Sequence, residues 1–147
     1  MLFRSLAEGE ARPVALAVLE HYRPRFAGDE LPESEAGAVL ALAERLELLL
    51  SIFCKGERPT GSSDPYGLRR AGNGLVQILW RQGWSLDLVQ LLERASQQWV
   101  EEFLRNDKPS SALCADLEEL LRQRVSSLLL EEGCDQDLVL EIGRAHV

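Results

Sequence analysis

Residues 34–55 constrain the fold most, because they predict one long helix that is apolar on almost every side. Four large side chains recur at i, i+4, i+7 and i+11, the spacing of a single helical face: Leu42, Leu46, Leu49 and Phe53. Further apolar residues widen that face: Leu48, Leu50 and Ile52. Ser34 has a side chain suited to capping the start, and Gly56 is suited to ending the helix. The half of the helix that carries these apolar residues is expected at the centre of a hydrophobic core.

The rest of the chain also predicts helices, since no stretch alternates between apolar and polar residues as a half-buried strand does. The fold class is therefore predicted to be all-α, with about six helices. They are expected over residues 12–22, 34–55, 64–82, 85–105 and 110–132, with a last one from 135. Asp64 and Ser85 are the expected caps of two of them, and Pro65 the first helical residue after Asp64.

Three glycines fall inside the helix expected over 64–82: Gly67, Gly72 and Gly74. Each lowers helix stability by about 1 kcal/mol relative to alanine. Their presence indicates that something approaches the backbone closely, either another helix or a nucleic-acid backbone.

The charge distribution limits the partners. The net charge of −8 argues against general nucleic-acid binding, yet residues 55–81 carry five basic and two acidic side chains. If the chain contacts RNA, the contact is therefore expected at that segment. Three widely spaced cysteines, Cys54, Cys114 and Cys134, suggest reduced thiols in a cytoplasmic protein. A membrane span and a secretory signal are not expected.

Two motifs carry a family resemblance. The first reads E-H-Y-x-P-R-F-A-G-D-x-L-P from Glu20 to Pro32. The second reads G-x-x-P-T-G-S-x-D-P-Y-x-L-R-R from Gly56 to Arg70. In this order they resemble the β subunit of the bacterial two-subunit glycyl-tRNA synthetase, and the resemblance covers roughly residues 1–140.

The resemblance implies an internal fragment of a longer subunit. Residues 1–83 would be the C-terminal part of an HD-like helical domain, with a soft boundary near Gly83, and residues 84–140 the start of a helical body. Residues 141–147, EIGRAHV, resemble the translation of a sequencing adapter and are expected to be a non-native tail.

The function that the resemblance implies is recognition and positioning of tRNA(Gly) for its ATP-dependent glycylation in the cytoplasm. The partners would be tRNA(Gly) and the α subunit, which uses ATP with magnesium at its own adenylation site. For this chain no catalytic residue, bound cofactor or metal is expected, and neither DNA nor membrane is an expected partner.

The candidate tRNA-binding residues are the basic side chains Lys55, Arg58, Arg69, Arg70 and Arg81. A second set is expected to build a rigid turn before a capped helix: Gly56, Pro59, Thr60, Gly61, Ser62, Asp64 and Pro65. Arg69 and Arg70 stand near a helix start, where positive charge is unfavourable. Either acidic residues of another helix or RNA phosphates are expected to compensate them.

Neither a nucleotide-binding P-loop nor a metal site is expected. Residues 56–63 have the glycine spacing of a phosphate-binding P-loop, but Ser62 stands where that loop needs lysine. His21 lacks a His-Asp pair, and Glu44 and Glu47 stand where the family usually has aspartate, so a metal site is not expected. The alternative functions are a non-catalytic helical protein-interaction module and a degenerate HD hydrolase. The latter would need a metal-binding His-Asp pair upstream of Met1.

Overall fold

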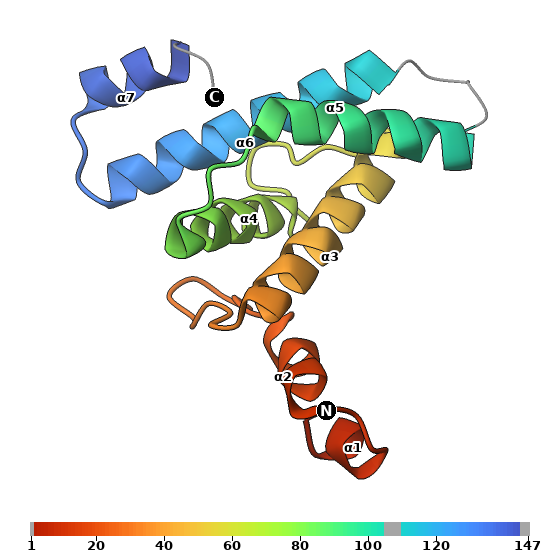
Figure 1. Ribbon diagram of the computed structural model, residues 1–147. Coiled ribbons are helices and arrows are strands. Elements are labelled where there is room, and N and C mark those ends of the chain that lie inside the picture. The colour runs from red at the N-terminus through yellow and green to blue at the C-terminus, as the bar shows by residue number, and fades with distance from the viewer. Residues whose placement is uncertain (1, 105–109, 145–147) are drawn as a thin grey trace.

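The computed structural model describes residues 2–104 and 110–144, and within these ranges the protein is built from helices (Figure 1). The helices are α1 (Leu2–Ala7), α2 (Arg12–Glu20), α3 (Glu35–Cys54), α4 (Leu68–Gln82), α5 (Leu88–Trp99), the π-helix η1 (Val100–Leu104), α6 (Ser110–Glu131) and α7 (Gln136–Arg144). No strand occurs in the described part, where one isolated bridge joins Thr60 and Ser63. The all-α prediction is confirmed.

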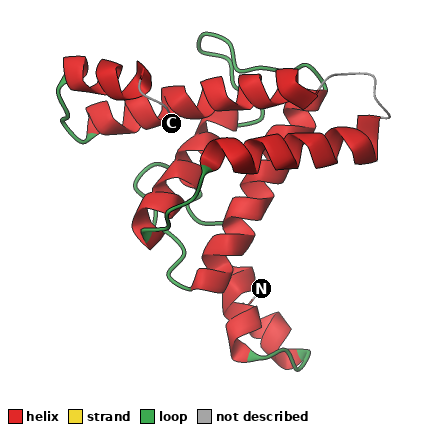
Figure 2. Ribbon diagram, turned by 45° about the horizontal axis from the view of Figure 1, so that its top comes forward, coloured by secondary structure: helices red, strands yellow, loops and turns green. Residues whose placement is uncertain are grey.

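Helix α3 runs through the middle of the molecule, as its apolar sequence requires. Helices α1 and α2 form an arm that extends from its N-terminal end (Figure 1). At its other end α5 and α6 lie side by side, and α4 packs against both α3 and α6 (Figures 1 and 2). The arrangement places the loop between α3 and α4 beside the start of α4.

One hydrophobic core unites α3, α4, α5 and α6. Its most deeply buried large side chains are Leu49, Leu68, Leu75, Leu92, Leu117 and Leu121. The central position predicted for the half of this helix that carries Leu42, Leu46, Leu49 and Phe53 is thus confirmed. Core residues come from both sides of Gly83, so the domain boundary there stays a prediction.

Several element boundaries differ from those expected. Helix α4 begins at Leu68 rather than after Asp64, because Gly67 adopts φ +67° and lies outside the helix. Helix α5 is capped by Asp87 rather than Ser85, since the Asp87 carboxylate accepts a hydrogen bond from the Gln90 amide at 2.9 Å. The first expected helix ends at Glu20, two residues early. The cap expected at Ser34 is confirmed by its 3.0 Å hydrogen bond from the Gly37 amide.

Two elements were not anticipated. Helix α1 is short and lacks a strong apolar rhythm, and η1 continues α5 with wider π-helical turns. With α1 included, the described part holds seven α-helices rather than about six. Helix α7 includes residues 141–144 of the expected non-native tail, whereas residues 145–147 and residue 105 lie outside the described residues. None of the described helices is long and apolar enough to cross a membrane.

Candidate functional site

The second motif forms a closed loop between α3 and α4, here called the signature loop (residues 56–67). The Thr60 amide donates to the Ser63 carbonyl at 3.0 Å, and the Ser63 amide donates back to the Thr60 carbonyl at 2.7 Å. Gly61 stands at the turn between them with φ +49°, a conformation that other residues rarely adopt. The loop therefore has one defined path.

Asp64 joins this loop to the start of α4. Its two carboxylate oxygens accept hydrogen bonds from the backbone amides of Leu68 at 2.8 Å and Arg69 at 3.0 Å. The Arg69 guanidinium then reaches back and donates to the Gly61 carbonyl at 2.8 Å. The signature loop and the first turn of α4 are consequently one hydrogen-bonded unit.

Arg58 is held by the fold rather than presented to solvent. Its guanidinium donates to the carbonyls of Phe53 and Glu57, both at 2.8 Å, and forms an ion pair with Asp116 of α6. It also lies over the Phe53 ring, 4.0 Å from the ring centre. These contacts tie the loop to α6.

The structure does not gather the other candidate cations at one point. Lys55, Arg70 and Arg81 are exposed, and Arg69 is half-buried. Arg70 and Arg81 lie near opposite ends of α4, about 16 Å apart along its axis. Within the described residues neither Arg69 nor Arg70 forms an ion pair, so neither is compensated by an acidic side chain from another described helix.

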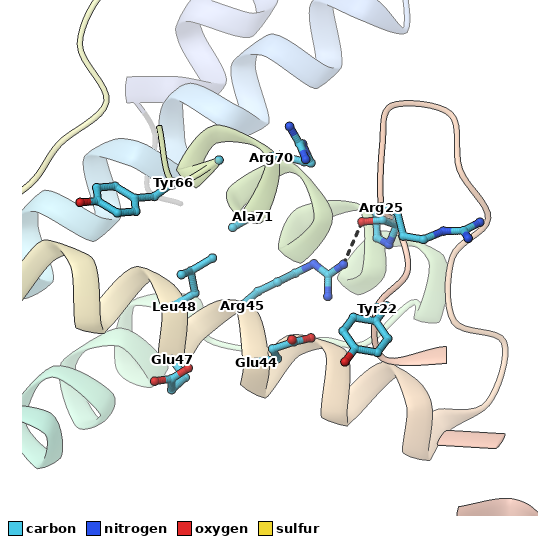
Figure 3. Close-up of a pocket in the computed structure, with 11 residues that line it drawn as sticks. Tyr22, Arg25, Glu44, Arg45, Glu47, Leu48, Tyr66, Arg70 and Ala71 are labelled. Carbon is cyan, nitrogen blue, oxygen red and sulfur yellow. Dashed lines mark hydrogen bonds between the residues drawn. The ribbon is translucent and has the colours of Figure 1, made fainter. Parts of the chain in front are cut away.

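The two motifs meet at an open groove of about 430 Å³ (Figure 3). Its lining comes from the segment after α2, from α3, and from the signature loop with α4: Tyr22, Pro24, Arg25, Glu44, Arg45, Glu47, Leu48, Tyr66, Gly67, Arg70 and Ala71. Sequence reasoning did not predict that the motifs would come together. The spacing between them carries no sign of it, because the contact depends on how α3 lies between the two segments.

Arg45 forms the floor between the two motifs, and sequence analysis missed its role. Its guanidinium donates to the Ala41 carbonyl at 2.9 Å and the His21 carbonyl at 3.2 Å. It also donates to the Pro24 carbonyl at 3.1 Å, the bond that is dashed in Figure 3. Burial lowers the pKa of Arg45, and the nearby charge of Glu44 opposes that effect. One signal was present in the sequence: Gly74, which leaves room for this side chain.

The glycines of α4 admit side chains from two neighbouring helices. A Cβ at Gly74 would lie 2.5 Å from Arg45 Nε on α3, and a Cβ at Gly72 would lie 2.9 Å from Arg124 Cγ on α6. The close approach predicted at these positions is confirmed, and in the structure it is made by other helices. Gly67 serves another purpose, because its positive φ precedes the helix.

The first motif secures the groove from the side of α2. The buried Glu20 carboxylate accepts a hydrogen bond from the Ser34 amide at 3.1 Å and another from the Ser34 hydroxyl. Arg25 donates to Asp29 through Nε at 2.8 Å, Nη2 at 3.0 Å and its backbone amide at 2.8 Å. The guanidinium hydrogen bonds, with the amide hydrogen bond next in importance, hold the pKa of Asp29 well below its usual value.

His21 has ordinary local partners. Its Nδ1 lies 2.6 Å from the Val18 carbonyl oxygen, and its Nε2 lies 4.0 Å from Glu44 Oε2. Among the described residues no group of three or more His, Cys, Asp and Glu side chains is placed to hold a metal ion.

The groove has two chemically different walls. Arg70 and the exposed rings of Tyr22 and Tyr66 can offer a guanidinium and aromatic faces, which suit phosphates and bases respectively. Arg70 and Tyr66 lie on the α4 side, whereas Glu44 and Glu47 place negative charge on the α3 side, where Tyr22 lies beside Glu44 (Figure 3). An anionic ligand is thus favoured on the α4 side.

Comparison with known proteins agrees with both motifs. A family model described as "Glycyl-tRNA synthetase beta subunit" matches residues 5–142. A glycine–tRNA ligase beta subunit of Streptococcus gordonii is 53% identical over 138 residues, covering 94% of this chain and 19% of that protein. The corresponding subunit of Trichodesmium erythraeum is 47% identical over 134 residues, covering 90% of this chain and 18% of the relative. The chain therefore spans about a fifth of the length of these relatives.

Proposed function

Because the chain belongs to the glycyl-tRNA synthetase beta subunit family, we propose that it is a tRNA-positioning part of a glycine–tRNA ligase. In this proposal the chain helps to recognise tRNA(Gly) and to hold it for ATP-dependent glycylation. The α subunit is the partner that forms the adenylate, using ATP and magnesium. The residues of this chain contribute by fixing the position of a reactant rather than by reacting with it.

The observation that carries the proposal is the exposed Arg70 at the groove where both motifs meet. A guanidinium without an acidic partner among the described residues is free to bind an RNA phosphate with two parallel hydrogen bonds. Arg58 and Arg69 differ from it, because both already donate to carbonyls of the signature loop or its flanks. Both therefore help to shape the loop, and Arg69 does so through Nη2 alone, whereas the whole guanidinium of Arg70 is available to a ligand.

The groove also orients its ligand. Tyr22 and Tyr66 are 45% and 48% exposed, so their rings are open to stacking with unpaired bases. Glu44 and Glu47 repel phosphates from the opposite wall. The RNA backbone would follow α4, with unpaired bases turned towards the tyrosines.

The test uses a complete β subunit in which residues 5–142 replace the matching segment, assayed together with its α subunit. Arg70→Ala should raise the KM for tRNA. It should also reduce the slope of log tRNA affinity against log salt concentration by the amount expected for the loss of about one phosphate contact. Formation of glycyl-adenylate without tRNA should not change. Arg94→Ala is the matched control, because Arg94 is an exposed arginine of α5 that does not line the groove.

The proposal fails if Arg70→Ala and Arg94→Ala give the same salt dependence in a folded protein. A chimaera that folds but does not glycylate tRNA would argue against the ligase function itself.

One observation favours a second function, contact with another protein segment. Four small or apolar residues of α3 are exposed at i, i+3, i+4 and i+7: Ala36, Val39, Leu40 and Ala43. This spacing forms one helical stripe, of a kind that packs against a neighbouring helix. Leu40→Glu in the same chimaera should weaken its assembly with the α subunit, or its own stability, while leaving the salt dependence of tRNA binding unchanged.

A further inference from the structure

Arg124 of α6 is a basic side chain at the α4–α6 contact that the motifs do not include. It lies across Gly72 of α4, where an added Cβ would be 2.9 Å from its Cγ and 3.7 Å from its Cδ. Its Nε is buried and has no hydrogen-bond partner among the described residues. Nor does its guanidinium form an ion pair within that part of the chain.

A second guanidinium approaches the same place. Arg69 precedes Gly72 by three residues, which puts both positions on one face of α4. Burial lowers the pKa of Arg124, and the positive charge of Arg69 lowers it further. Two arginines from different helices are therefore near neighbours at the start of α4.

The nearby carboxylates do not fully compensate them. Asp64 and Glu131 both oppose these effects at Arg124, but neither forms an ion pair with it among the described residues. Both oxygens of Asp64 already accept backbone amides of α4. Like charges held together are unfavourable unless an anion joins them. The helix dipole at the start of α4 also favours negative charge.

Resting on the tRNA-binding function proposed above, we propose that Arg124 and Arg69 together bind one phosphate of the tRNA backbone. Arg69 and Arg70 are adjacent, so their side chains leave α4 in directions about 100° apart. A phosphate at Arg69 and Arg124 would consequently lie on a different face of α4 from the groove. The RNA strand would cross the first turn of α4, with contacts on both sides of it.

RNA is the expected source of the anion because the anion would lie beside a basic segment of a chain whose net charge is negative. The basic segment 55–81 is exceptional in a chain of net charge −8, and Arg124 extends it onto a second helix. A polyanion gains from each added cation by releasing a counterion, whereas a single carboxylate does not.

The experiment measures the affinity of the full α–β complex for tRNA(Gly) across a series of KCl concentrations, again with residues 5–142 in a complete β subunit. Arg124→Gln should reduce the slope of log affinity against log salt by about 0.7–0.9 and weaken binding about tenfold at low salt. Arg122→Gln is the matched control, because Arg122 is an exposed arginine two residues away on α6. It should leave both quantities unchanged.

Two further variants separate a phosphate contact from packing. Arg124→Lys retains the charge but not the two-pronged guanidinium, so it should keep most of the slope and lose part of the affinity. Gly72→Ala retains the arginine but displaces it, and should reduce the slope as Arg124→Gln does. A lower melting temperature with an unchanged slope in both Arg124→Gln and Gly72→Ala would overturn the phosphate site and leave a packing role.

The remaining outcomes are also decisive. If the parent chimaera lacks salt-dependent tRNA binding, the proposed function fails and this inference fails with it. Normal tRNA binding by Arg124→Gln, with weaker association of the two subunits, would identify a protein carboxylate as the anion and overturn the RNA assignment.

Discussion

Arg45 of α3 lies directly against Gly74 of α4, so that a Cβ at position 74 would come 2.5 Å from Arg45 Nε. The arginine has little freedom to move, because it is buried and donates to three carbonyls. Gly74→Ala should therefore lower the free energy of unfolding by about 1–3 kcal/mol, although alanine is the better helix former. Urea denaturation followed by circular dichroism measures this change.

The same substitution in an Arg45→Met background tests the cause. Methionine is unbranched and flexible, so it can move aside for the new methyl group. The decrease in the free energy of unfolding caused by Gly74→Ala should then fall towards zero. An equal loss in both backgrounds would mean that the Arg45 contact is not responsible.

Asp64 should have two effects: it should stabilise the start of α4, and it should keep the signature loop in the shape that binds tRNA. Asp64→Ala removes the acceptor of the Leu68 and Arg69 amides, and should cost about 0.5–2 kcal/mol of stability. Asp87→Ala removes a similar cap from α5, away from the signature loop. Both variants should lower the melting temperature, but only Asp64→Ala should also weaken tRNA binding. Equal tRNA affinity in the two would separate the loop from the RNA.

The pair Arg25–Asp29 predicts a dependence of stability on pH. Arg25 holds the pKa of Asp29 well below its usual 3.8, so the unfolded chain binds the proton more readily than the folded chain. The stabilisation is complete above about pH 5 and is lost as the pH falls through the acid range. Urea midpoints measured from pH 6 to pH 3 should therefore fall less steeply in Asp29→Asn. Arg25→Gln should flatten the curve in the same way, and a curve as steep as that of the parent would contradict the assignment.

Cys114 should react slowly with alkylating reagents. Burial raises its pKa, and the charge of Glu118 raises it further, so less thiolate is present near pH 8. Iodoacetamide labelling followed by peptide mapping should show Cys114 modified more slowly than the partly exposed Cys134. Faster labelling of Cys114 than of Cys134 would show that this side of α6 opens readily.

Much of the fold could be predicted from the sequence, because helix spacing and helix caps are patterns of residues that are close together in the chain. Leu42, Leu46 and Leu49 mark one face of a central helix by spacing alone, and Ser34 caps that helix as its residue type suggests. The start of α4 was misplaced because Asp64 caps it from four residues away, across Gly67 in a left-handed conformation. That bond depends on the path of the loop, which propensity does not specify.

Less of the candidate site could be predicted, because its main contacts join residues that are far apart in the sequence. Arginine is usually exposed, so nothing in the sequence marked Arg45 as a buried residue joining α3 to the segment after α2. Arg58 was a candidate for RNA, yet the chain folds Asp116 onto it from 58 residues away. Only Gly72 and Gly74 indicated close contacts, and they did not name the partners.

The arm formed by α1 and α2 is fastened at its base and not at its tip. Glu20 accepts a hydrogen bond from the Ser34 amide, and Arg45 donates to the His21 carbonyl, at the base of the arm. Within the described residues α1 packs mainly against α2. Backbone amides near Glu20 should consequently exchange with solvent deuterium almost as slowly as those of α3. Protection from exchange should decline along α2 towards α1 and be least in α1. The far end of the arm should therefore unfold locally more often than its base.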